Sequence, residues 1–232
     1  MPLSPATRIE IEERMQKIEE KIRKLEVAHF QCPKGITVDE SMHRARLDVE
    51  DKGCYSAKWK WVPANYYDRP MEERAKILGA PSTLLLCKSL LMENKAVVGS
   101  NKDPTNPKYL LVVVQYEATL DVRKLANAIR AMRPVQERLD YNAFDFRVAS
   151  TEDNDRLTGY AHNSVTPFGL LQDVPIVLSA AVAPLHFFWM GGGHVHLKLG
   201  VAVSEFLKAT NAMVADISQP RSGASEDDDA AV

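Results

Sequence analysis

The stretch PSTLLLCKSLLMENK, residues 81–95, decides the fold, because it predicts a buried β-strand with one lysine, Lys88, at its centre. Side chains alternate between the two faces of a strand, so Lys88 shares its face with four apolar residues, Leu84, Leu86, Leu90 and Met92. A lysine is seldom fully buried without a partner, since removing water from its charge is costly. Two interpretations remain open: Lys88 lies near the sheet rim and extends its ammonium group to water, or its face lines a pocket for an anionic group such as a phosphate.

The rest of the chain alternates predicted strands with predicted helices. The apolar run YLLVVVQY at 109–116 predicts a central strand that is covered on both faces. We expect further strands near 58–62, 144–149, 175–181, 187–190 and 196–199, and helices near 71–78, 121–132 and 204–215. Strands interspersed with helices predict an α/β or α+β sheet domain.

Residues 5–29 predict a helix of a different kind. Pro5 suits the first turn, and Thr7 with Glu10 can form a capping box. The apolar residues of this helix recur at steps of 4, 3, 4 and 3 in a narrow coiled-coil-like stripe, which consists of Ile11, Met15, Ile18, Ile22 and Leu25. Because helices of this length are marginal alone, the stripe packs either on the chain's own domain or on a partner helix from a second copy or another protein.

These patterns divide the chain into four parts. An amphipathic helix is expected at residues 1–30, and a linker of irregular or partly helical character at residues 31–52. The globular domain is expected at 53–216, and an acidic tail, expected to be disordered, at 217–232. At 232 residues the chain has material for one good-sized hydrophobic core and little more.

Charge and cysteine content exclude several classes of protein. The formal net charge is −2, so the chain lacks the global basic field of duplex-DNA binders. The three cysteines are widely spaced without a C-x-x-C motif, which indicates neither a disulfide framework nor a zinc site. The N-terminal sequence lacks the apolar core of a signal peptide, and no apolar run is long enough to span a membrane. We therefore expect a cytoplasmic protein with no membrane partner.

Two glycine-bearing stretches are candidate ligand sites. The loop TGYAHNSVTPFG, residues 158–169, combines glycines with Pro167 and small polar residues, and such a loop can present backbone groups to a ligand. In WMGGGH, residues 189–194, three consecutive glycines indicate a place where the backbone must approach something closely. The sequence contains no nucleotide-phosphate fingerprint.

Three other patterns give weaker signals. The alternation KWKWV at 58–62 suits single-stranded nucleic acid, but the sequence alone favours an edge strand whose tryptophans face the core and whose lysines face water. His194 and His196 share a strand face, but no third ligand is evident, so we expect no metal site. Ser164 lies close to His162 but has neither a G-x-S-x-G elbow nor an acid partner, so we do not expect serine catalysis.

The lysine strand, the Gly-Tyr…Val-Thr-Pro-Phe-Gly loop and the Gly-Gly-Gly run occur in an order that resembles the YbaK and prolyl-tRNA synthetase editing-domain superfamily of aminoacyl-tRNA deacylases. The likeness covers roughly Trp59 to Ala215. It is closest to the free-standing eukaryotic branch, in which segments like Lys60-Trp61-Val62-Pro63 and Tyr66-Tyr67-Asp68 precede the core. The resemblance implies an α/β fold with a curled, mixed sheet and flanking helices.

The resemblance also implies hydrolysis, without a cofactor, of the ester that joins a wrong amino acid to the terminal adenosine of a tRNA. It places Lys88 on the family's lysine, which is expected to bind the terminal phosphate or ribose region. The Gly-x-x-x-P loop that holds the aminoacyl group corresponds to Asn163, Ser164, Val165, Thr166 and Pro167, and the glycine run beside the pocket to Gly191, Gly192 and Gly193. Asn163 replaces the first glycine of the loop, and asparagine tolerates left-handed backbone angles better than most residues.

The expected chemistry agrees with these residues. An aminoacyl ester is already activated, so a positioned water and backbone donors for the oxyanion suffice, and neither a catalytic triad nor a metal is needed. We predict a trans-editing deacylase for tRNA that carries a small amino acid of the Ala/Ser/Thr class. It would bind the tRNA acceptor end and attach through its N-terminal helix to a synthetase, a multi-synthetase complex or a second copy. The alternative is a non-catalytic tRNA-binding or scaffolding subunit of a synthetase complex.

Overall fold

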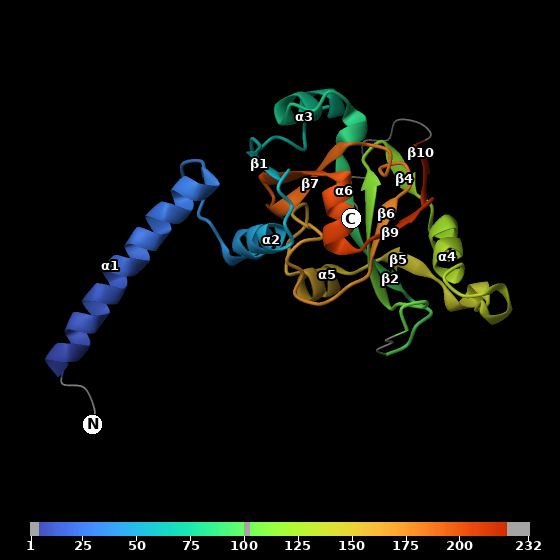
Figure 1. The fold of residues 1–232 in the computed structure, drawn as a ribbon, viewed down its shortest axis with the longest axis horizontal. Helices are drawn as coiled ribbons and strands as arrows, with labels where there is room; N and C mark the ends of the chain where they lie inside the picture. The colour runs from blue at the N-terminus through green and yellow to red at the C-terminus, as the bar shows by residue number, and fades with distance from the viewer. Residues whose placement is uncertain (1–4, 100–102, 222–232) are drawn as a thin grey trace. The chain divides into compact units, whose positions relative to one another are not determined.

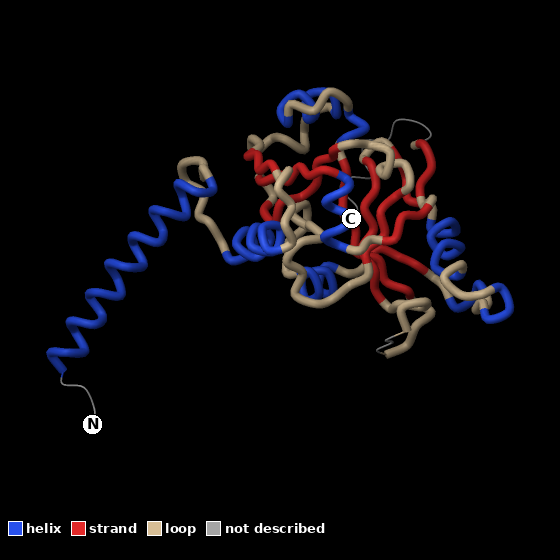
Figure 2. Tube along the Cα trace, viewed as in Figure 1, coloured by secondary structure: helices blue, strands red, loops and turns tan. Residues whose placement is uncertain are grey.

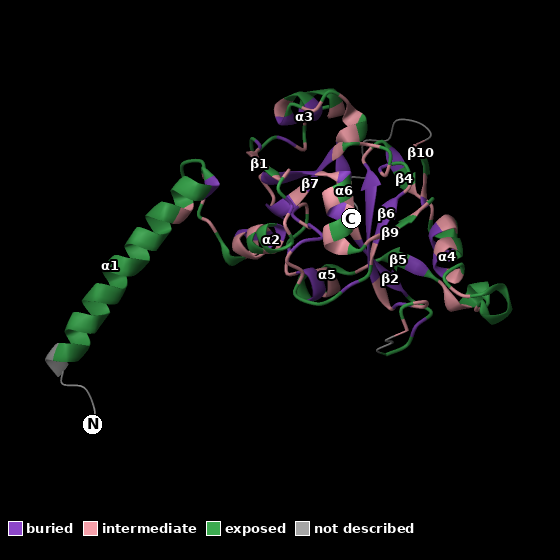
Figure 3. Ribbon diagram, in the orientation of Figure 1, coloured by how far each residue is buried: buried purple, intermediate pink, exposed green. Residues whose placement is uncertain are grey.

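The computed structural model describes residues 5–99 and 103–221. The chain divides into two compact units, Met1–Glu40 and Ser41–Val232. The first unit contains α1, Pro5–Phe30, which confirms the predicted long N-terminal helix. Figure 3 colours almost all of α1 as exposed, and the five residues of its apolar stripe are between 40% and 70% exposed.

The strands described in the second unit form three sheets (Figures 1 and 2). The five-stranded sheet has the order β5-β2-β3-β6-β9 and consists of β2 (Cys87–Asn94), β3 (Tyr109–Gln115), β5 (Phe146–Val148), β6 (Ile176–Ser179) and β9 (Met213–Ala215). The three-stranded sheet has the order β1-β8-β7 and consists of β1 (Lys58–Trp61), β7 (Phe187–His194) and β8 (Leu197–Ala202). β4 (Ala118–Leu120) pairs with β10 (Ser218–Pro220). The β3–β6 and β6–β9 pairs are parallel and the others antiparallel, which confirms the mixed sheet and the fold class.

Helices cover both faces of the five-stranded sheet. On one face, α4 (Val122–Arg130) packs Leu125 and Ile129 against Val112 and Val114 of β3. On the other face, α6 (Val203–Thr210) packs Phe206 against a cluster that includes residues of β3 and β6. Figure 1 shows the two helices on opposite sides of these strands. The run at 109–116 is therefore a central strand covered on both faces, as its unbroken apolar character predicts.

Three short helices complete the second unit around the two larger sheets. They are α2 (Glu40–Asp51), α3 (Met71–Leu78) and α5 (Thr151–Thr158), and 3-10 turns lie at Thr83–Leu85, Val135–Glu137 and Tyr141–Ala143. The left-handed Gly79 ends α3, and the left-handed Gly159 ends α5. Glycine has no Cβ and adopts this conformation at no steric cost, so both helices end where the sequence supplies a glycine.

Residues 31–52 differ from the predicted linker, because α2 packs into the core. Its apolar residues Met42, Ala45 and Val49 are at most 1% exposed. They recur at steps of 3 and 4, the spacing of one helix face. The compact unit therefore begins at Ser41 rather than near residue 53.

Four further predictions need correction. The strand expected at 81–95 begins only at Cys87, because the Ser82 side chain accepts a hydrogen bond from the Leu84 N–H and caps a 3-10 turn, which removes Leu84 from the face of Lys88. The helix expected at 204–215 ends at left-handed Asn211, and β9 follows it. The tail expected from residue 217 begins with the strand β10, and its remainder from residue 222 lies outside the described residues. The glycine run expected after a strand lies within β7.

No helix among the described residues combines the length and apolar character that crossing a membrane requires.

Candidate active site

A cavity of about 100 Å³ lies beside β2 and brings together the three stretches that the sequence singles out. It is lined by Lys88, Ser89, Leu90 and Leu91 of β2, by Tyr67, Tyr116, His162, Asn163, Val165 and Gly191, and by Val148, Ala149, Thr151 and Asn154. Of the nine predicted site residues, Lys88, Asn163, Val165 and Gly191 line the cavity. The other five, Ser164, Thr166, Pro167, Gly192 and Gly193, do not line it.

Lys88 borders the cavity at a partly open sheet edge. One edge of β2 pairs with β3, whereas on the other edge β5 pairs only with residues 92–94, and the cavity lies beside residues 88–91. The Lys88 side chain is half-buried, and its Nζ lies 5.7 Å from the centre of the Tyr116 ring. Lys88 is thus partly open to water, as expected for a lysine near the sheet rim, and it also lines a pocket that can receive an anionic group. Features of both sequence interpretations are therefore present.

The loop that follows α5 is shaped by its own backbone contacts. Asn163 has a φ of 63°, so it keeps the left-handed conformation that a glycine would adopt at this position. Ser164 is buried, and its Oγ donates to the Ala161 carbonyl at 2.6 Å. Because this hydroxyl is occupied and does not line the cavity, Ser164 is not placed to act as a nucleophile.

The glycine run of β7 packs directly on the backbone of that loop. A Cβ at Gly191 would lie 2.3 Å from the Val165 carbonyl oxygen, so only glycine fits here without a shift of the backbone. The Gly193 N–H donates to the Ser164 carbonyl at 3.0 Å. The close approach to residues 164–165 is made by Gly191, whereas a Cβ at Gly192 would meet the backbone of Leu197 and one at Gly193 would meet Ala45 and Ser41 of α2.

Tyr67 fixes the other side of the loop, and sequence reasoning did not select it as a site residue. Its Oη donates to the Asn163 carbonyl at 3.0 Å, and it accepts a hydrogen bond from the Lys198 Nζ. Arg74 is 7% exposed and donates to the Tyr67 carbonyl. Tyr67 is thus held through both its hydroxyl and its backbone while its side chain lines the cavity.

Lys198 is the second lysine near the cavity, and it is only 4% exposed. Its Nζ also donates to the Val195 carbonyl at 3.2 Å and lies 4.5 Å from the centre of the Tyr67 ring. Burial, with a smaller contribution from the nearby positive charge of Arg74, lowers the pKa of Lys198 from 10.5 to about 7. The sequence carried a signal for this lysine: in LKLGVA, a single cation interrupts an apolar strand, as Lys88 does in β2.

α2 holds both ends of the loop 159–169. Arg44 Nη2 donates to the Gly159 carbonyl at 2.9 Å, and its Nε donates to the Gly169 carbonyl at 3.1 Å. Asp48 accepts from the Gly169 N–H at 2.8 Å. The segment that sequence reasoning assigned to a linker therefore sets the span of the candidate substrate loop.

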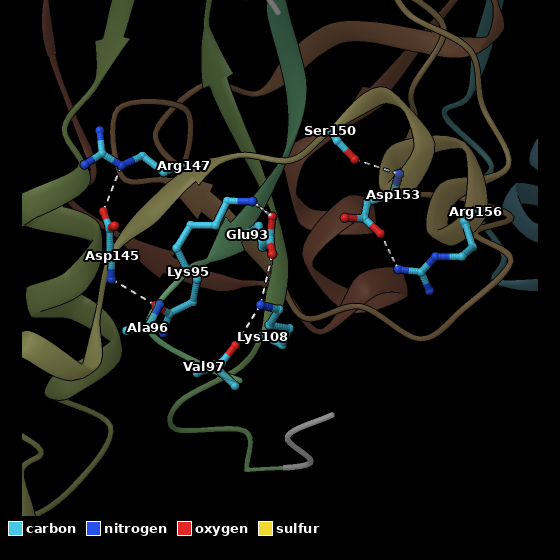
Figure 4. A network of polar contacts seen from close by, with 11 residues as sticks. Glu93, Lys95, Ala96, Val97, Lys108, Asp145, Arg147, Ser150, Asp153 and Arg156 are labelled. Carbon is cyan, nitrogen blue, oxygen red and sulfur yellow. Dashed lines mark hydrogen bonds and ion pairs between the residues drawn. The ribbon is translucent and has the colours of Figure 1, made fainter. Parts of the chain in front are cut away.

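Polar contacts at the far end of β2 support the cavity wall (Figure 4). Glu93, whose side chain is 7% exposed, forms ion pairs with Lys95 and with Lys108, the latter at 2.9 Å. Nearby, the Ser150 hydroxyl caps α5 by accepting from the Asp153 N–H at 3.2 Å, which fixes the start of a helix whose Thr151 and Asn154 line the cavity.

His194, the last residue of β7, contacts His196 in the turn that follows. Their ring centres are 5.5 Å apart, and the His196 N–H donates to His194 Nδ1 at 3.1 Å. Among the described residues, no group of three or more His, Cys, Asp or Glu side chains has the arrangement of a metal site. The expected absence of a metal stays a prediction.

Comparison with known proteins identifies the family. The family model of the aminoacyl-tRNA editing domain matches residues 69–209, which include Lys88, the loop 163–167 and the glycine run. The chain belongs to the aminoacyl-tRNA editing domain family. Editing in this family is deacylation of aminoacyl-tRNA, so the predicted enzyme class, an ester hydrolase acting on aminoacyl-tRNA, is confirmed. Arg44 and Tyr67 of this editing domain lie before the matched segment.

Several solved structures have the same fold as this editing domain. A candidate trans-editing enzyme for prolyl-tRNA synthetase is 23% identical with a TM-score of 0.61, covering 79% of this chain and 99% of its own. A structure from work on epitope grafting onto scaffold proteins is 22% identical with a TM-score of 0.61, covering 79% and 100%. The hypothetical protein APE2540 is 21% identical with a TM-score of 0.56, covering 76% and 99%. At these identities the likeness concerns the fold. No curated protein is significantly similar to this editing-domain chain.

Proposed function

We propose that this editing domain acts in trans on tRNA mischarged with a small amino acid of the Ala/Ser/Thr class. The observation that carries the proposal is the single cavity in which Lys88 meets the loop of Asn163 and Val165 and the close-packed Gly191. The small side chains of this loop favour a small aminoacyl group over a large one. Ser89, Thr151, Asn154 and His162 supply polar groups in its lining.

In this proposal, the chain's own groups divide the work of ester hydrolysis. Lys88 binds the terminal phosphate or ribose region of the tRNA as a point charge. The loop from Asn163 to Pro167 holds the aminoacyl group, and Gly191 to Gly193 keep that loop in place. Backbone N–H groups at the loop stabilise the oxyanion that forms when water attacks the ester carbon, and the ribose hydroxyl leaves with the proton that the water gives up.

The left-handed φ of Asn163 supports catalysis over a purely scaffolding role. The loss of the family's glycine at this position would argue for an inactive domain if the loop had changed shape. Asn163 has a φ of 63°, a left-handed conformation that glycine also adopts readily, so the substitution is compatible with such a turn. The non-catalytic alternative therefore gains no support from this position.

The acceptor end of the tRNA has a suitable surface next to the cavity. A groove beside β1 has an apolar floor that includes Leu78, Phe187 and Trp189, and its rim carries Lys58 and Lys60. Across the sheet, Lys60 pairs with Lys198, and Lys198 pairs with Gly191, so the groove and the cavity border the same sheet face. Aromatic rings beside cations suit unpaired nucleotides, so we propose that the single-stranded acceptor end follows this groove.

Deacylation of a panel of mischarged tRNAs tests the proposal. The panel carries Ala, Ser, Thr, Cys and Pro esters, and the wild-type chain is compared with Lys88→Ala and with Lys208→Ala, which changes an exposed lysine of α6. We expect rapid hydrolysis of one or two small esters, a loss of roughly 100-fold or more in Lys88→Ala, and no change in Lys208→Ala. Equal rates of hydrolysis by the wild type and by Lys88→Ala would contradict the proposal. So would the absence of turnover of any ester above the spontaneous rate.

A second comparison tests the groove separately from the chemistry. The double variant Lys58→Gln/Lys60→Gln should raise KM for aminoacyl-tRNA and reduce the salt dependence of KM, because fewer phosphate contacts release fewer counterions. Its kcat should stay close to the wild-type value, since neither lysine lines the cavity. If KM and its salt dependence are unchanged in the double variant, the groove does not bind the acceptor end of the tRNA. The deacylase proposal would still stand.

A further inference from the structure

The described face of α1 that carries its apolar stripe is covered by nothing in its own compact unit. Ile11, Met15, Ile18, Ile22 and Leu25 follow the heptad steps of a coiled coil and are between 40% and 70% exposed. Isolated amphipathic helices with this few apolar turns are marginal in water. The stripe is therefore suited to a second helix, and the remaining question is which helix.

The charges that flank the stripe answer this question. In the heptad register set by the stripe, Met15 and Ile22 occupy a positions, and Ile11, Ile18 and Leu25 occupy d positions. The e positions that follow each d residue are all acidic, and they are Glu12, Glu19 and Glu26. The g positions that precede the two a residues are both basic, and they are Arg14 and Lys21. One flank of the stripe is negative and the other positive.

Such a helix is complementary to a parallel copy of itself. In a parallel pair, the g residue of one helix faces the e residue of the next heptad on its partner, so Arg14 meets Glu19 and Lys21 meets Glu26, each twice. In an antiparallel pair, g faces g and e faces e, which would set basic against basic and acidic against acidic. The charge pattern therefore favours the parallel arrangement and opposes the antiparallel one.

We infer that α1 is a homodimerisation helix that pairs with α1 of a second copy as a parallel, two-stranded coiled coil. Five core residues per helix make a short interface, so the association is reversible and depends on the protein concentration. Each dimer carries two editing domains, and a dimer can hold two acceptor ends or bind one tRNA more tightly through the second copy. The inference concerns assembly and does not depend on the proposed ester chemistry.

Sedimentation velocity of the full chain over a range of concentrations tests this assembly. The wild-type chain should shift from monomer toward dimer as its concentration rises. Ile18→Glu should remain monomeric, because it places a charge in the apolar stripe, and the matched control Gln16→Glu, at an outward b position, should dimerise like the wild type. A wild-type chain that stays monomeric throughout, or an Ile18→Glu chain that still dimerises, would overturn the inference.

Charge variants test the proposed pairing itself. The double variant Arg14→Glu/Lys21→Glu has two acidic flanks. The double variant Glu19→Lys/Glu26→Lys has a basic g flank and a largely basic e flank. Each variant alone should therefore form less dimer than the wild type at the same concentration. Mixed in equal amounts, the two variants should form a 1:1 heterodimer because their flanks are again opposite in sign. If each variant dimerises as well as the wild type, the charged flanks do not select the partner and the inference fails.

Cysteine crosslinking reports the orientation of the pair. Cys32 lies two residues after the end of α1 and is partly exposed, whereas Cys54 and Cys87 are buried. In a parallel dimer, the two Cys32 thiols come close together, and a short bismaleimide should join them, with Cys32→Ser as the control. A wild-type dimer that does not crosslink through Cys32 would contradict the parallel arrangement. Thermal unfolding of the same preparations shows that the editing domain of each variant is folded, whatever its assembly state.

Discussion

The Tyr67 hydroxyl donates a hydrogen bond to the backbone carbonyl of Asn163 at 3.0 Å. This contact joins a segment that precedes α3 to the one left-handed asparagine of the described substrate loop. The same hydroxyl accepts from Lys198, so a buried cation, a tyrosine and the loop backbone form one connected chain. Since the Asn163 carbonyl belongs to the peptide group shared with Ser164, fixing this carbonyl also fixes where the next N–H points.

Tyr67→Phe should lower activity more than it lowers stability. The variant keeps the ring and removes the hydroxyl, which leaves the Asn163 carbonyl and the Lys198 ammonium each without this partner. We expect kcat to fall by roughly 10-fold or more from the misplaced loop, and the free energy of unfolding to fall by about 1–3 kcal/mol. Deacylation kinetics and urea unfolding measure both. Tyr55→Phe, at a tyrosine that is 93% exposed, is the matched control. Equal activity of the two variants would show that the contact does not position the loop.

Lys198 should make the stability of the domain depend on pH between neutral and alkaline conditions. Burial lowers its pKa from 10.5 to about 7, so between these values the unfolded chain binds a proton that the folded chain does not. The free energy of unfolding contributed by this group therefore rises as the pH increases from about 7 to 10.5 and is lowest below pH 7. Lys198→Met removes the charge with similar length, so its stability should vary less over this range.

Denaturant unfolding of both proteins at pH 7 and pH 9.5 measures this difference. The stability of the wild type relative to Lys198→Met should increase with pH by on the order of a few kcal/mol. Other titrating groups are common to the two proteins and cancel in the comparison. If the difference between the two proteins is the same at both pH values, Lys198 keeps its ordinary pKa in the folded state.

The sequence predicted the parts of this site that depend on local pattern. The apolar run of β3 and the crowding at Gly191 each follow from the spacing of residue types in one stretch, as does the apolar stripe of α1 outside the site. The register between strands does not follow from any one stretch. Lys198 reaches Tyr67 only because β8 pairs with both β1 and β7, and the sequence of β8 alone shows just a lysine between apolar residues.

The packing of α2 into the core was missed for a different reason. Its apolar residues Met42, Ala45 and Val49 have helical spacing, but charged residues surround them and Pro33 and Gly35 suggested an irregular connection. α5, TEDNDRLT, is too polar to show any apolar face, and its Ser150 cap was the available signal. The local sequence pattern of both helices is too weak to predict a helix, and tertiary contacts with the substrate loop stabilise the helical conformation.

Arg44→Lys should weaken the loop although it conserves the charge. The guanidinium donates to the carbonyls of Gly159 and Gly169 from two different nitrogens, and a lysine ammonium cannot span both in the same geometry. We expect a loss of about 1–3 kcal/mol in unfolding free energy and a higher KM for aminoacyl-tRNA. Arg46→Lys, at an arginine that pairs with Glu50 on the same helix, is the control. A KM that is equal in the two variants would show that α2 does not set the span of the loop.

Gly191→Ala should be more damaging than the neighbouring Gly192→Ala. A Cβ at residue 191 would lie 2.3 Å from the Val165 carbonyl oxygen, whereas at residue 192 the nearest atom, the Leu197 carbonyl oxygen, is 3.0 Å away. Both obstacles are backbone atoms, so β7 and the loop must separate at Gly191, and we expect a loss of about 1–3 kcal/mol there together with a marked loss of activity. Thermal unfolding and deacylation, measured side by side, test the order. A Gly192→Ala variant that is the less active of the two would contradict the proposed packing of β7 on the substrate loop.

Glu93 should contribute stability that acid removes. Burial alone would raise its pKa, but hydrogen bonds and charge interactions with Lys95 and Lys108 outweigh burial and hold the pKa of Glu93 below its usual value (Figure 4). A carboxyl whose pKa is lowered by folding stabilises the protein above its unfolded pKa of about 4.3 and loses this effect as the pH falls through the folded value. Glu93→Gln should therefore be less stable than the wild type at pH 7, and the two should converge in acid. Urea unfolding at pH 7, 5 and 3 measures the difference, with Glu117→Gln as a carboxyl with no ion pair among the described residues. A difference that persists undiminished at pH 3 would show that Glu93 acts through its shape and hydrogen bonds, and that its charge contributes nothing to the stability of β2.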